Sequence, residues 1–307
     1  MFLSILLATL ADLLTWPGQS NGFLMGALFL VVLGLLDDRF DLSPAAKLLG
    51  QIVAAWCLVG FDGVGIHTLG DLLGLGQIGL GVISLPVTLF VVVGLMNAVN
   101  FFDGLDGLAA GMALIGLMVL TLVATLTNQI QILPMLIACL ATVAGFWVFN
   151  MRFHTNHQAF VFMGNAGSML LGFTLAWFSI QLTQSNDSAL PPIFALWILS
   201  LPLIETLSLI GRRLWAGRHP FQAGRDHLHH ALLVTGLGHA GTVWVLLFIQ
   251  ILLAGIGYVC WRAGVAEHLM FGAFVALLLA YHTALPHGWK LIAWFNSERG
   301  PAIGRSR

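Results

Sequence analysis

The fold is decided by residues 85–126, which read LPVTLFVVVGLMNAVNFFDGLDGLAAGMALIGLMVLTLVATL. Two apolar runs, 85–96 and 112–126, flank a short polar centre. The rest of the chain has the same character: 59% of its 307 residues are hydrophobic and 8% are charged, whereas soluble domains carry about a quarter charged residues. Because helices satisfy their own backbone hydrogen bonds in lipid, the sequence predicts an all-α, polytopic integral membrane helical bundle.

The polar centre of this stretch holds four side chains spaced by three, Asn97, Asn100, Asp103 and Asp106. Amides and carboxylates at the end of a membrane-length segment are costly, so a functional role is the default interpretation. Each step of three falls short of a full helical turn by ~60°, so Asn97 and Asp106 would face opposite ways on an unbroken helix. The glycines at 104 and 107 therefore predict a tightened or broken helix that closes round a ligand. The alternative is an ordinary Asp-Gly turn.

Apolar runs predict ten membrane helices in a single domain over residues 1–307, with a cytoplasmic tail from 286. The net charge of −1 argues against nucleic acid as a partner. The three cysteines lie in apolar runs and predict neither a disulfide framework nor a zinc site. The predicted helices cover residues 2–16, 22–36, 45–60, 80–97, 107–126, 131–149, 164–182, 191–210, 242–260 and 267–285.

The basic residues predict the orientation of the bundle. With ten spans, the segments 37–44, 98–106, 150–163, 211–241 and the tail from 286 fall on one side. Eleven of the twelve Lys and Arg residues lie there, if Lys47 just inside the next helix is included, and only Arg262 lies opposite. This bias identifies that side as cytoplasmic. The same side collects the unusual acidic and histidine side chains, so we expect the site at the cytoplasmic face.

The first candidate segment is LGLLDDRFDLS, residues 33–43. Asp37 and Asp38 at a helix end, with Asp41 a turn later, concentrate negative charge that a cation or a basic group must compensate. Mg²⁺ suits such a site, and alternatively one carboxylate could accept a proton beside the metal. The alternative is a solvated acidic helix cap. Lys47 either snorkels to the interface or points its ammonium group at a diphosphate.

The second candidate segment is VFMGNAGSMLLGF, residues 161–173. Gly164 and Gly167 flank Asn165 at the head of a predicted helix, with Ser168 behind them. The amide groups and positive dipole of a helix start suit a phosphate or a metal–phosphate group. Close packing of small residues between helices explains the same pattern equally well.

The third candidate segment is the loop 211–241, which contains four arginines and five histidines. A mixture of Arg and His suits an anionic phosphate ester better than zinc, because Arg repels a cation and binds phosphate with two N–H groups. The alternative is a basic loop that touches anionic lipid. Glu205, near the inner end of the preceding helix, could pair with Arg212 or Arg213 or orient a histidine.

Four motifs in order, LGLLDDRFDLS, NAVNFFDGLDGLAAG, VFMGNAGSMLLGF and GRDHLHHALL, resemble those of the polyprenyl-phosphate N-acetylhexosamine-1-phosphate transferases. The resemblance runs from about residue 20 to 240, and the R-x-H-x-H-H form of the last motif is similar to the undecaprenyl-phosphate GlcNAc-1-phosphate transferase branch. It implies a bacterial enzyme of the cytoplasmic (inner) membrane in which undecaprenyl phosphate attacks the sugar-linked phosphate of a UDP-N-acetylhexosamine, most simply UDP-GlcNAc. UMP leaves and a lipid-linked cell-envelope glycan is started. The resemblance also implies Mg²⁺ as cofactor, with Mn²⁺ as the alternative, and a homodimer.

The resemblance assigns roles to residues by motif. Asp37 and Asp38 correspond to the catalytic pair, one of them a base for the lipid phosphate, and Lys47 to a diphosphate-binding residue. Asp103 and Asp106 fall where the family contacts the nucleotide. The full candidate set is catalytic Asp37, Asp38, Asp103 and Asp106; substrate-binding Lys47, Asn97, Arg225, His227, His229 and His230; and metal-binding Asn100 and Asn165.

Three departures from the family pattern affect the expected activity. Asn165 replaces the Asp of the family's G-D-x-G-S motif. The negative charge of one metal ligand is therefore missing, and we expect weaker metal binding. Glu205 stands where close relatives usually have Asp. The family also has a further helix and a basic loop before the equivalent of residues 1–16, so a missing start is expected.

Two other functions remain open. A catalytically weak or inactive family member could bind nucleotide sugar or polyprenyl phosphate, or scaffold partner glycosyltransferases, and Asn165 favours this function. A transporter would use the carboxylates as ion sites, but the chain shows no internal repeat of the kind that many transporters have.

Overall fold

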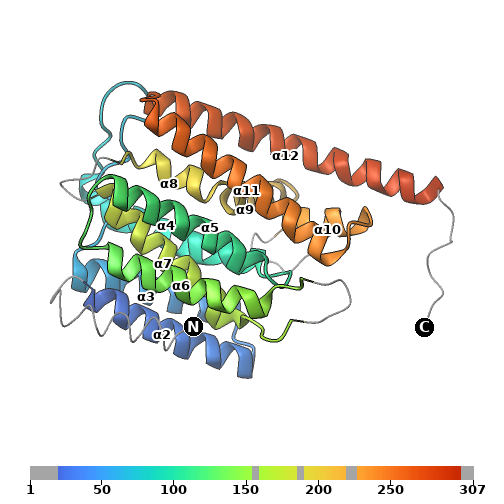
Figure 1. Ribbon diagram of the computed structural model, residues 1–307, viewed down its shortest axis with the longest axis horizontal. Coiled ribbons are helices and arrows are strands. Elements are labelled where there is room, and N and C mark those ends of the chain that lie inside the picture. Colours follow the sequence, from blue (N-terminus) through green and yellow to red (C-terminus); the bar gives the residue numbers. More distant parts are fainter. Residues whose placement is uncertain (1–19, 154–158, 185–189, 219–226, 299–307) are drawn as a thin grey trace.

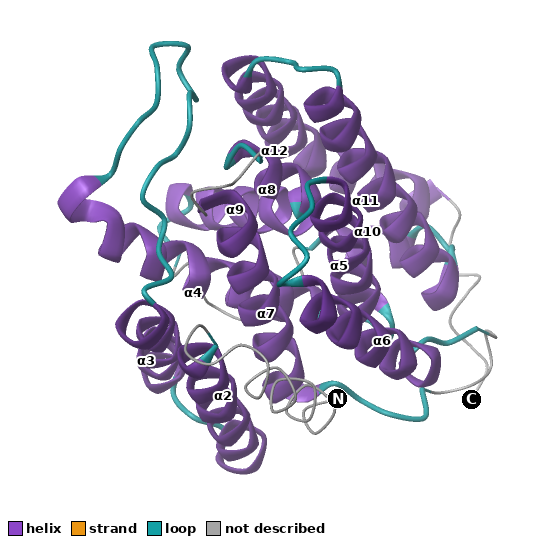
Figure 2. Cartoon of the chain, turned by 60° about the vertical axis from the view of Figure 1, so that its left-hand side comes forward, coloured by secondary structure: helices purple, strands orange, loops and turns teal. Residues whose placement is uncertain are grey.

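A computed structural model describes residues 20–153, 159–184, 190–218 and 227–298, and these form a bundle of helices (Figure 1). No strand is drawn in these ranges, where one isolated bridge joins Thr68 to Gly79 (Figure 2). The all-α prediction is confirmed. The elements are α2 (Asn21–Phe40), α3 (Pro44–Asp62), the 3-10 turn η1 (Gly81–Ile83), α4 (Ser84–Phe102), α5 (Leu108–Leu126), α6 (Leu133–Asn150), α7 (Gly164–Gln184), α8 (Ile193–Ile198), α9 (Ser200–Trp215), α10 (Leu228–Val234), α11 (Gly238–Arg262) and α12 (Glu267–Glu298).

Seven helices among the described residues are long and apolar enough to cross a membrane: α3, α4 with η1, α5, α6, α7, α11 and the part of α12 up to Pro286. A polytopic membrane protein is therefore confirmed, and the expected ten helices are an approximate count. The helix predicted over 2–16 lies outside the described residues. α12 extends past its neighbours at one end of the bundle (Figure 1).

The prediction of one continuous helix over 191–210 is wrong. The helix breaks at Leu199, because Pro202 lacks the N–H that an unbroken helix needs. Gln250 of α11 satisfies the freed backbone groups: its Nε2 donates to the Ile198 carbonyl at 2.5 Å, and its Oε1 accepts from the Leu201 N–H at 3.0 Å. An amide buried at this depth thus stabilises a helix break.

α7 is the central helix of the bundle, enclosed by α2, α4 and α5 (Figure 2). Two glycines allow its neighbours to approach closely. A Cβ on Gly172 would lie 2.6 Å from Met96 Cα of α4, and one on Gly34 would lie 2.2 Å from Ala166 Cα at the start of α7. The second contact places the acidic end of α2 directly beside Asn165.

Candidate active site

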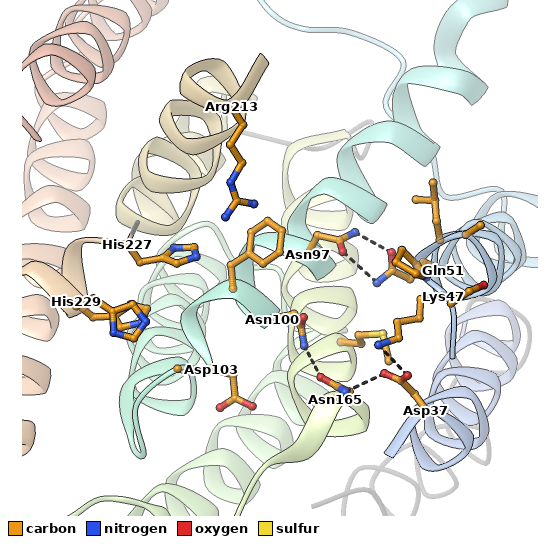
Figure 3. A pocket seen from close by; sticks show the side chains of 18 residues that line it. Asp37, Lys47, Gln51, Asn97, Asn100, Asp103, Asn165, Arg213, His227 and His229 are labelled. Carbon is orange, nitrogen blue, oxygen red and sulfur yellow. Dashed lines mark hydrogen bonds and ion pairs between the residues drawn. The ribbon is translucent and has the colours of Figure 1, made fainter. Parts of the chain in front are cut away.

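A cavity of about 800 Å³ lies at one end of the bundle, where α2, α4 and α9 end and α3, α7 and α10 begin. Side chains from all of these helices converge on it (Figure 3). Nine of the twelve predicted site residues line this cavity: Asp37, Lys47, Asn97, Asn100, Asp103, Asn165, His227, His229 and His230.

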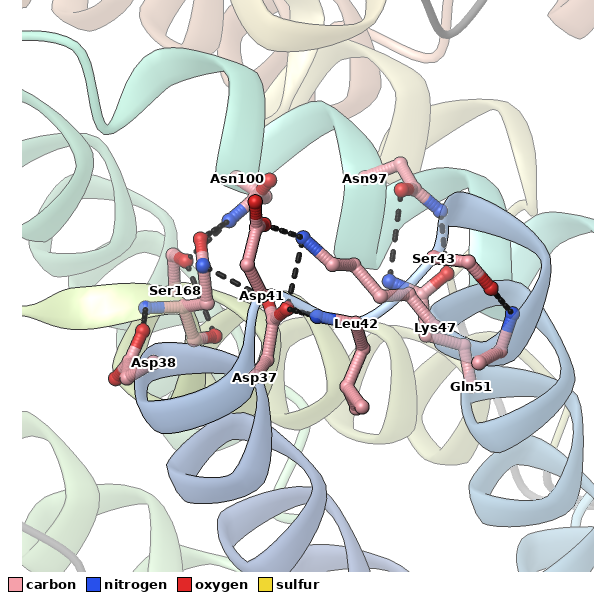
Figure 4. Close-up of polar contacts among 12 residues, drawn as sticks. Asp37, Asp38, Asp41, Leu42, Ser43, Lys47, Gln51, Asn97, Asn100 and Ser168 are labelled. Atoms are coloured by element: carbon pink, nitrogen blue, oxygen red, sulfur yellow. Dashed lines mark hydrogen bonds and ion pairs between the residues drawn. The ribbon is translucent and has the colours of Figure 1, made fainter.

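Asp37 is buried in the wall of the cavity, and both oxygens of its carboxylate have partners that compensate its negative charge (Figure 4). Its Oδ1 lies 2.8 Å from Lys47 Nζ and accepts from the Leu42 N–H at 3.0 Å. Its Oδ2 accepts from Asn165 Nδ2 at 2.8 Å. The chain turns back after α2 through a left-handed residue, Asp41, whose φ is 49°. Asp37 is therefore not a solvated helix cap, and Lys47 points at the site rather than at the membrane interface.

Asp38 faces a different partner from Asp37. Its Oδ1 accepts from the backbone N–H of Asn165 at 3.2 Å, which places the carboxylate at the N-terminus of α7. Asp38 thus occupies the start of α7, where a phosphate was expected from the sequence. Its negative charge stabilises the positive end of the α7 helix dipole. It is not among the residues that line the cavity, and its predicted catalytic role stays a prediction.

Two asparagines and a serine continue the polar wall between α4 and α7. Asn100 Nδ2 donates to Asn165 Oδ1 at 3.1 Å and to Ser168 Oγ at 2.8 Å. Asp37, Asn165 and Asn100 therefore form one hydrogen-bonded row, and carboxylate and amide groups carry the kind of oxygen atom that a hard ion such as Mg²⁺ takes as a ligand. Among the described residues, no group of three or more His, Cys, Asp or Glu side chains suits a metal.

Gln51 of α3 lines the cavity and was not predicted from the sequence. It forms a reciprocal amide pair with Asn97: Asn97 Nδ2 donates to Gln51 Oε1 at 2.7 Å, and Gln51 Nε2 lies 3.4 Å from Asn97 Oδ1 (Figure 4). Gln51 is 3% exposed. An uncharged amide in an apolar run is the signal that could have identified it, since buried polar groups in a membrane require a partner.

Asp103 and Asp106 lie in the loop between α4 and α5, where the helix breaks as predicted. Asp103 lines the cavity. Burial, together with the nearby charges of Asp106 and Asp38, raises the pKa of Asp103 to about 7. The carboxylate of Asp106 is instead paired with Arg152, whose Nε donates to its Oδ2 at 2.7 Å. Asp106 does not line the cavity.

The histidines of the third motif close the opposite side of the cavity (Figure 3). The rings of His227 and His229 stack with their centroids 5.3 Å apart, and the centroid of the His230 ring lies 4.3 Å from that of His229. Burial, followed by the positive fields of His230 and His227, lowers the pKa of His229 to about 3. His229 is therefore neutral at pH 7 and can act through its ring N–H or lone pair rather than as a cation. Arg225 lies outside the described residues.

Glu205 of α9 contacts the start of α10, the helix that carries His229 and His230. Its Oε1 accepts from the Leu228 N–H at 2.9 Å and lies 3.4 Å from His227 Nδ1. The Tyr281 hydroxyl of α12 donates to its other oxygen. Of the partners expected for Glu205, the structure thus provides a histidine. Arg213, from the last turn of the same helix, lines the cavity as well and was not in the predicted set.

The sequence model of glycosyl transferase family 4 matches residues 20–183, which is more than half of the chain. The chain belongs to glycosyl transferase family 4. The matched region runs from the start of α2 almost to the end of α7. It contains every carboxylate and amide of the family 4 cavity, whereas Arg213 and the histidines follow it in the sequence.

Curated relatives extend this similarity beyond the matched region. The chain is 31% identical to an undecaprenyl-phosphate alpha-N-acetylglucosaminyl 1-phosphate transferase of Yersinia pestis, over 88% of this chain and 74% of the relative. Proteins with the same name are 31% identical in Haemophilus influenzae, over 89% of this chain and 77% of the relative, and 30% identical in Escherichia coli K12, over 85% and 71%. The family resemblance seen in the four motifs is confirmed.

Proposed function

We propose that this chain transfers N-acetylglucosamine-1-phosphate from UDP-GlcNAc to undecaprenyl phosphate, and so starts a lipid-linked cell-envelope glycan. The names of the relatives support undecaprenyl phosphate as the acceptor and N-acetylglucosaminyl 1-phosphate as the transferred group. The observation that carries the proposal is the cavity itself, because it joins a carboxylate–lysine pair, a row of amides and a histidine cluster at the end of membrane-length helices. The bias of basic residues supports a site at the cytoplasmic face of the membrane, and the bacterial sources of the relatives support a bacterial inner membrane.

In the proposed reaction, an oxygen of the lipid phosphate forms a bond to the sugar-bearing phosphorus of UDP-GlcNAc. The bond from that phosphorus to the bridging oxygen breaks, and UMP leaves with this oxygen. Lys47 neutralises the diphosphate, and Asp37 accepts any proton that the lipid phosphate still carries. The His227 and His229 ring N–H groups orient phosphate oxygens from the other side. Phosphoryl transfer needs mainly such positioning and charge neutralisation.

We also propose Mg²⁺ as the cofactor, with Mn²⁺ as the alternative. Asn100 and Asn165 would hold the ion through their side-chain oxygens, beside the carboxylate of Asp37, with the remaining ligands from substrate phosphates and water. When bound, the ion would neutralise charge that develops on the diphosphate. Asn165 already takes part in two hydrogen bonds within this row, so the side chains are held in place before any ligand arrives.

The direct test is release of UMP by the purified full chain in lipid nanodiscs, supplied with UDP-GlcNAc, undecaprenyl phosphate and Mg²⁺. We expect release that depends on all three components, and a lipid-diphosphate sugar as the second product. Omission of undecaprenyl phosphate controls for hydrolysis of the nucleotide sugar. A folded protein that releases no UMP under these conditions would contradict the proposal.

A second candidate is a family member that binds the nucleotide sugar or the lipid without turnover. Asn165 favours this function, because the amide lacks the charge that the family motif places there. Stabilisation of the protein by UDP-GlcNAc against heat, without release of UMP, would support the binding role over the enzyme.

We expect that Gly104→Ala lowers UMP release by about tenfold or more, because a misplacement of an active-site group by 1 Å is enough for such a loss. A Cβ at this position would lie 2.5 Å from His229 Nε2, and the His229 ring is buried against two other histidines. The matched control is Gly94→Ala on α4, where a Cβ meets nothing within 4 Å. Equal rates of UMP release for the two variants would show that activity does not depend on the position of His229 beside Gly104.

A further inference from the structure

Asn150, the last residue of α6, carries a buried amide that binds backbone groups of two other segments. Its Oδ1 accepts from the Gly107 N–H at 2.8 Å, and its Nδ2 donates to the Val161 carbonyl at 2.9 Å. The residue is 2% exposed and is not among those that line the cavity. Because its amide has backbone partners and is closed to solvent, Asn150 is placed to hold chain segments rather than to bind a substrate.

The first of these segments is the loop between α4 and α5, residues 103–107, whose first two residues line the cavity. α6 holds the other end of this loop at both backbone groups of Gly107. In addition to the bond from Asn150, Trp147 Nε1 donates to the Gly107 carbonyl at 2.9 Å. Trp147 and Asn150 are three residues apart and so share one face of α6. Gly107 is buried and its φ of 86° is left-handed, so α6 fixes a backbone conformation that glycine adopts most readily.

The second segment is residues 159–163, which lead into α7. Val161, whose carbonyl accepts from Asn150, lies shortly before Asn165 in the sequence. Asn165 lines the cavity at the start of α7 and belongs to the hydrogen-bonded row with Asp37 and Asn100. One side chain therefore joins two segments that are far apart in the sequence and that both continue into the cavity wall.

We propose that Asn150, which lies outside the four motifs, is a positioning residue that fixes the loop 103–107 relative to the start of α7. The resemblance assigns the carboxylates of this loop to nucleotide contact, and Asn150 keeps them in a set place beside the polar row that includes Asn165. The inference rests on the proposed function for its kinetic test and on the structure alone for its hydrogen-exchange test.

Gln250 of α11 offers a matched control, because it makes the same two kinds of contact away from the cavity. Its Oε1 accepts from the Leu201 N–H and its Nε2 donates to the Ile198 carbonyl. It is fully buried and is not among the residues that line the cavity. Removing either amide deprives a backbone N–H and a carbonyl of their partner, so both changes should lower the apparent melting temperature. Only the change at Asn150 should also alter the site.

The test compares Asn150→Leu with Gln250→Met in lipid nanodiscs, at a temperature at which both variants stay folded. We expect Asn150→Leu to lower kcat/KM for UDP-GlcNAc by about 10- to 100-fold, because a shift of 1 Å in a positioning segment is enough for such a loss. Without undecaprenyl phosphate, its binding of UDP-GlcNAc should weaken by about tenfold. Gln250→Met should stay within about threefold of the wild type in both measurements, since its site is distant and independent. Trp147→Phe, which removes only the second contact to Gly107, should give a milder loss in the same direction if Asn150→Leu does not fold.

Hydrogen exchange provides a readout that needs no activity. In Asn150→Leu, the backbone amides of residues 103–111 and of residues 159–166 should both exchange faster than in the wild type, and in Gln250→Met neither segment should change. Faster exchange in only one segment, or in neither, would show that Asn150 does not join them. Equal losses of kcat/KM in the two variants would also overturn the inference, because a general loss of stability would then explain both. If the wild type neither releases UMP nor binds UDP-GlcNAc, the proposed function fails, and hydrogen exchange alone decides the inference.

Discussion

Replacing Asp37 with asparagine is expected to lower the rate of UMP release by about 10²- to 10⁴-fold, the range for loss of a positioned general base. The substitution removes the carboxylate that lies 2.8 Å from Lys47 Nζ and accepts from Asn165 Nδ2. An amide at this place turns its N–H₂ group either to Lys47 Nζ and the Leu42 N–H or to Asn165 Nδ2, so at least one donor loses its acceptor. We therefore also expect a lower apparent melting temperature, because the Asp37 side chain is 1% exposed and a buried donor without an acceptor costs about 1–3 kcal/mol.

The matched control for this prediction is Asp41→Asn. Asp41 lies in the same turn and its carboxylate is 3.9 Å from Lys47 Nζ, but its side chain is fully exposed. Exposed ion pairs contribute little to stability, so this variant should keep the rate and melting temperature of the wild type. If Asp37→Asn retained more than about a tenth of wild-type activity, Asp37 would be a structural partner of Lys47 rather than the base.

Polar groups in membrane-length segments made most of the site predictable. Burying an amide or carboxylate near lipid is costly, so residues such as Asn97, Asn100 and Asn165 identify the site from their positions alone. Placing the motifs at helix ends on one side of the membrane then brought them to one cavity. This reasoning requires only span boundaries and the bias of basic residues.

The orientation of individual carboxylates could not be predicted in the same way. Adjacent residues on a helix point about 100° apart, so Asp37 and Asp38 at the end of α2 meet different partners, and only the first lines the cavity. A spacing of three predicts a direction only while the helix continues. α4 ends at Phe102, and beyond it the contact with Arg152, distant in sequence, decides where Asp106 points.

Single polar residues within apolar runs were missed because each has a partner on another helix. Gln51 pairs with Asn97 across α3 and α4, and Gln250 of α11 satisfies the break between α8 and α9. Neither contact has a local sequence signal, and Pro202 alone does not specify which side chain will fill the break. Contacts between helices of this kind are set by packing and are visible only in the folded bundle.

Asn165→Asp is the substitution that separates a weakened enzyme from a non-catalytic binder. The new carboxylate could no longer donate to Asp37. The two carboxylates would then face each other where Asn165 Nδ2 now donates to Asp37 Oδ2 at 2.8 Å. Without metal, we expect a lower apparent melting temperature than in the wild type, because like charges at this distance repel. With Mg²⁺, the two carboxylates would share the ion, and attraction between unit charges 4 Å apart is about 4 kcal/mol at an effective dielectric constant of 20.

The measurements are the apparent melting temperature and the rate of UMP release, each as a function of Mg²⁺ concentration. We expect the Asn165→Asp variant to gain more melting temperature from Mg²⁺ than the wild type, to reach half of its effect at a concentration at least about tenfold lower, and to turn over faster at saturation. Asn97→Asp adds the same charge to the same cavity beside Gln51 rather than Asp37, so its melting temperature should respond to Mg²⁺ as the wild type does. A stronger response of Asn165→Asp to Mg²⁺ without any UMP release would favour the binding role. No change in its response would show that the metal does not bind between α2 and α7, since the added carboxylate lies in that contact.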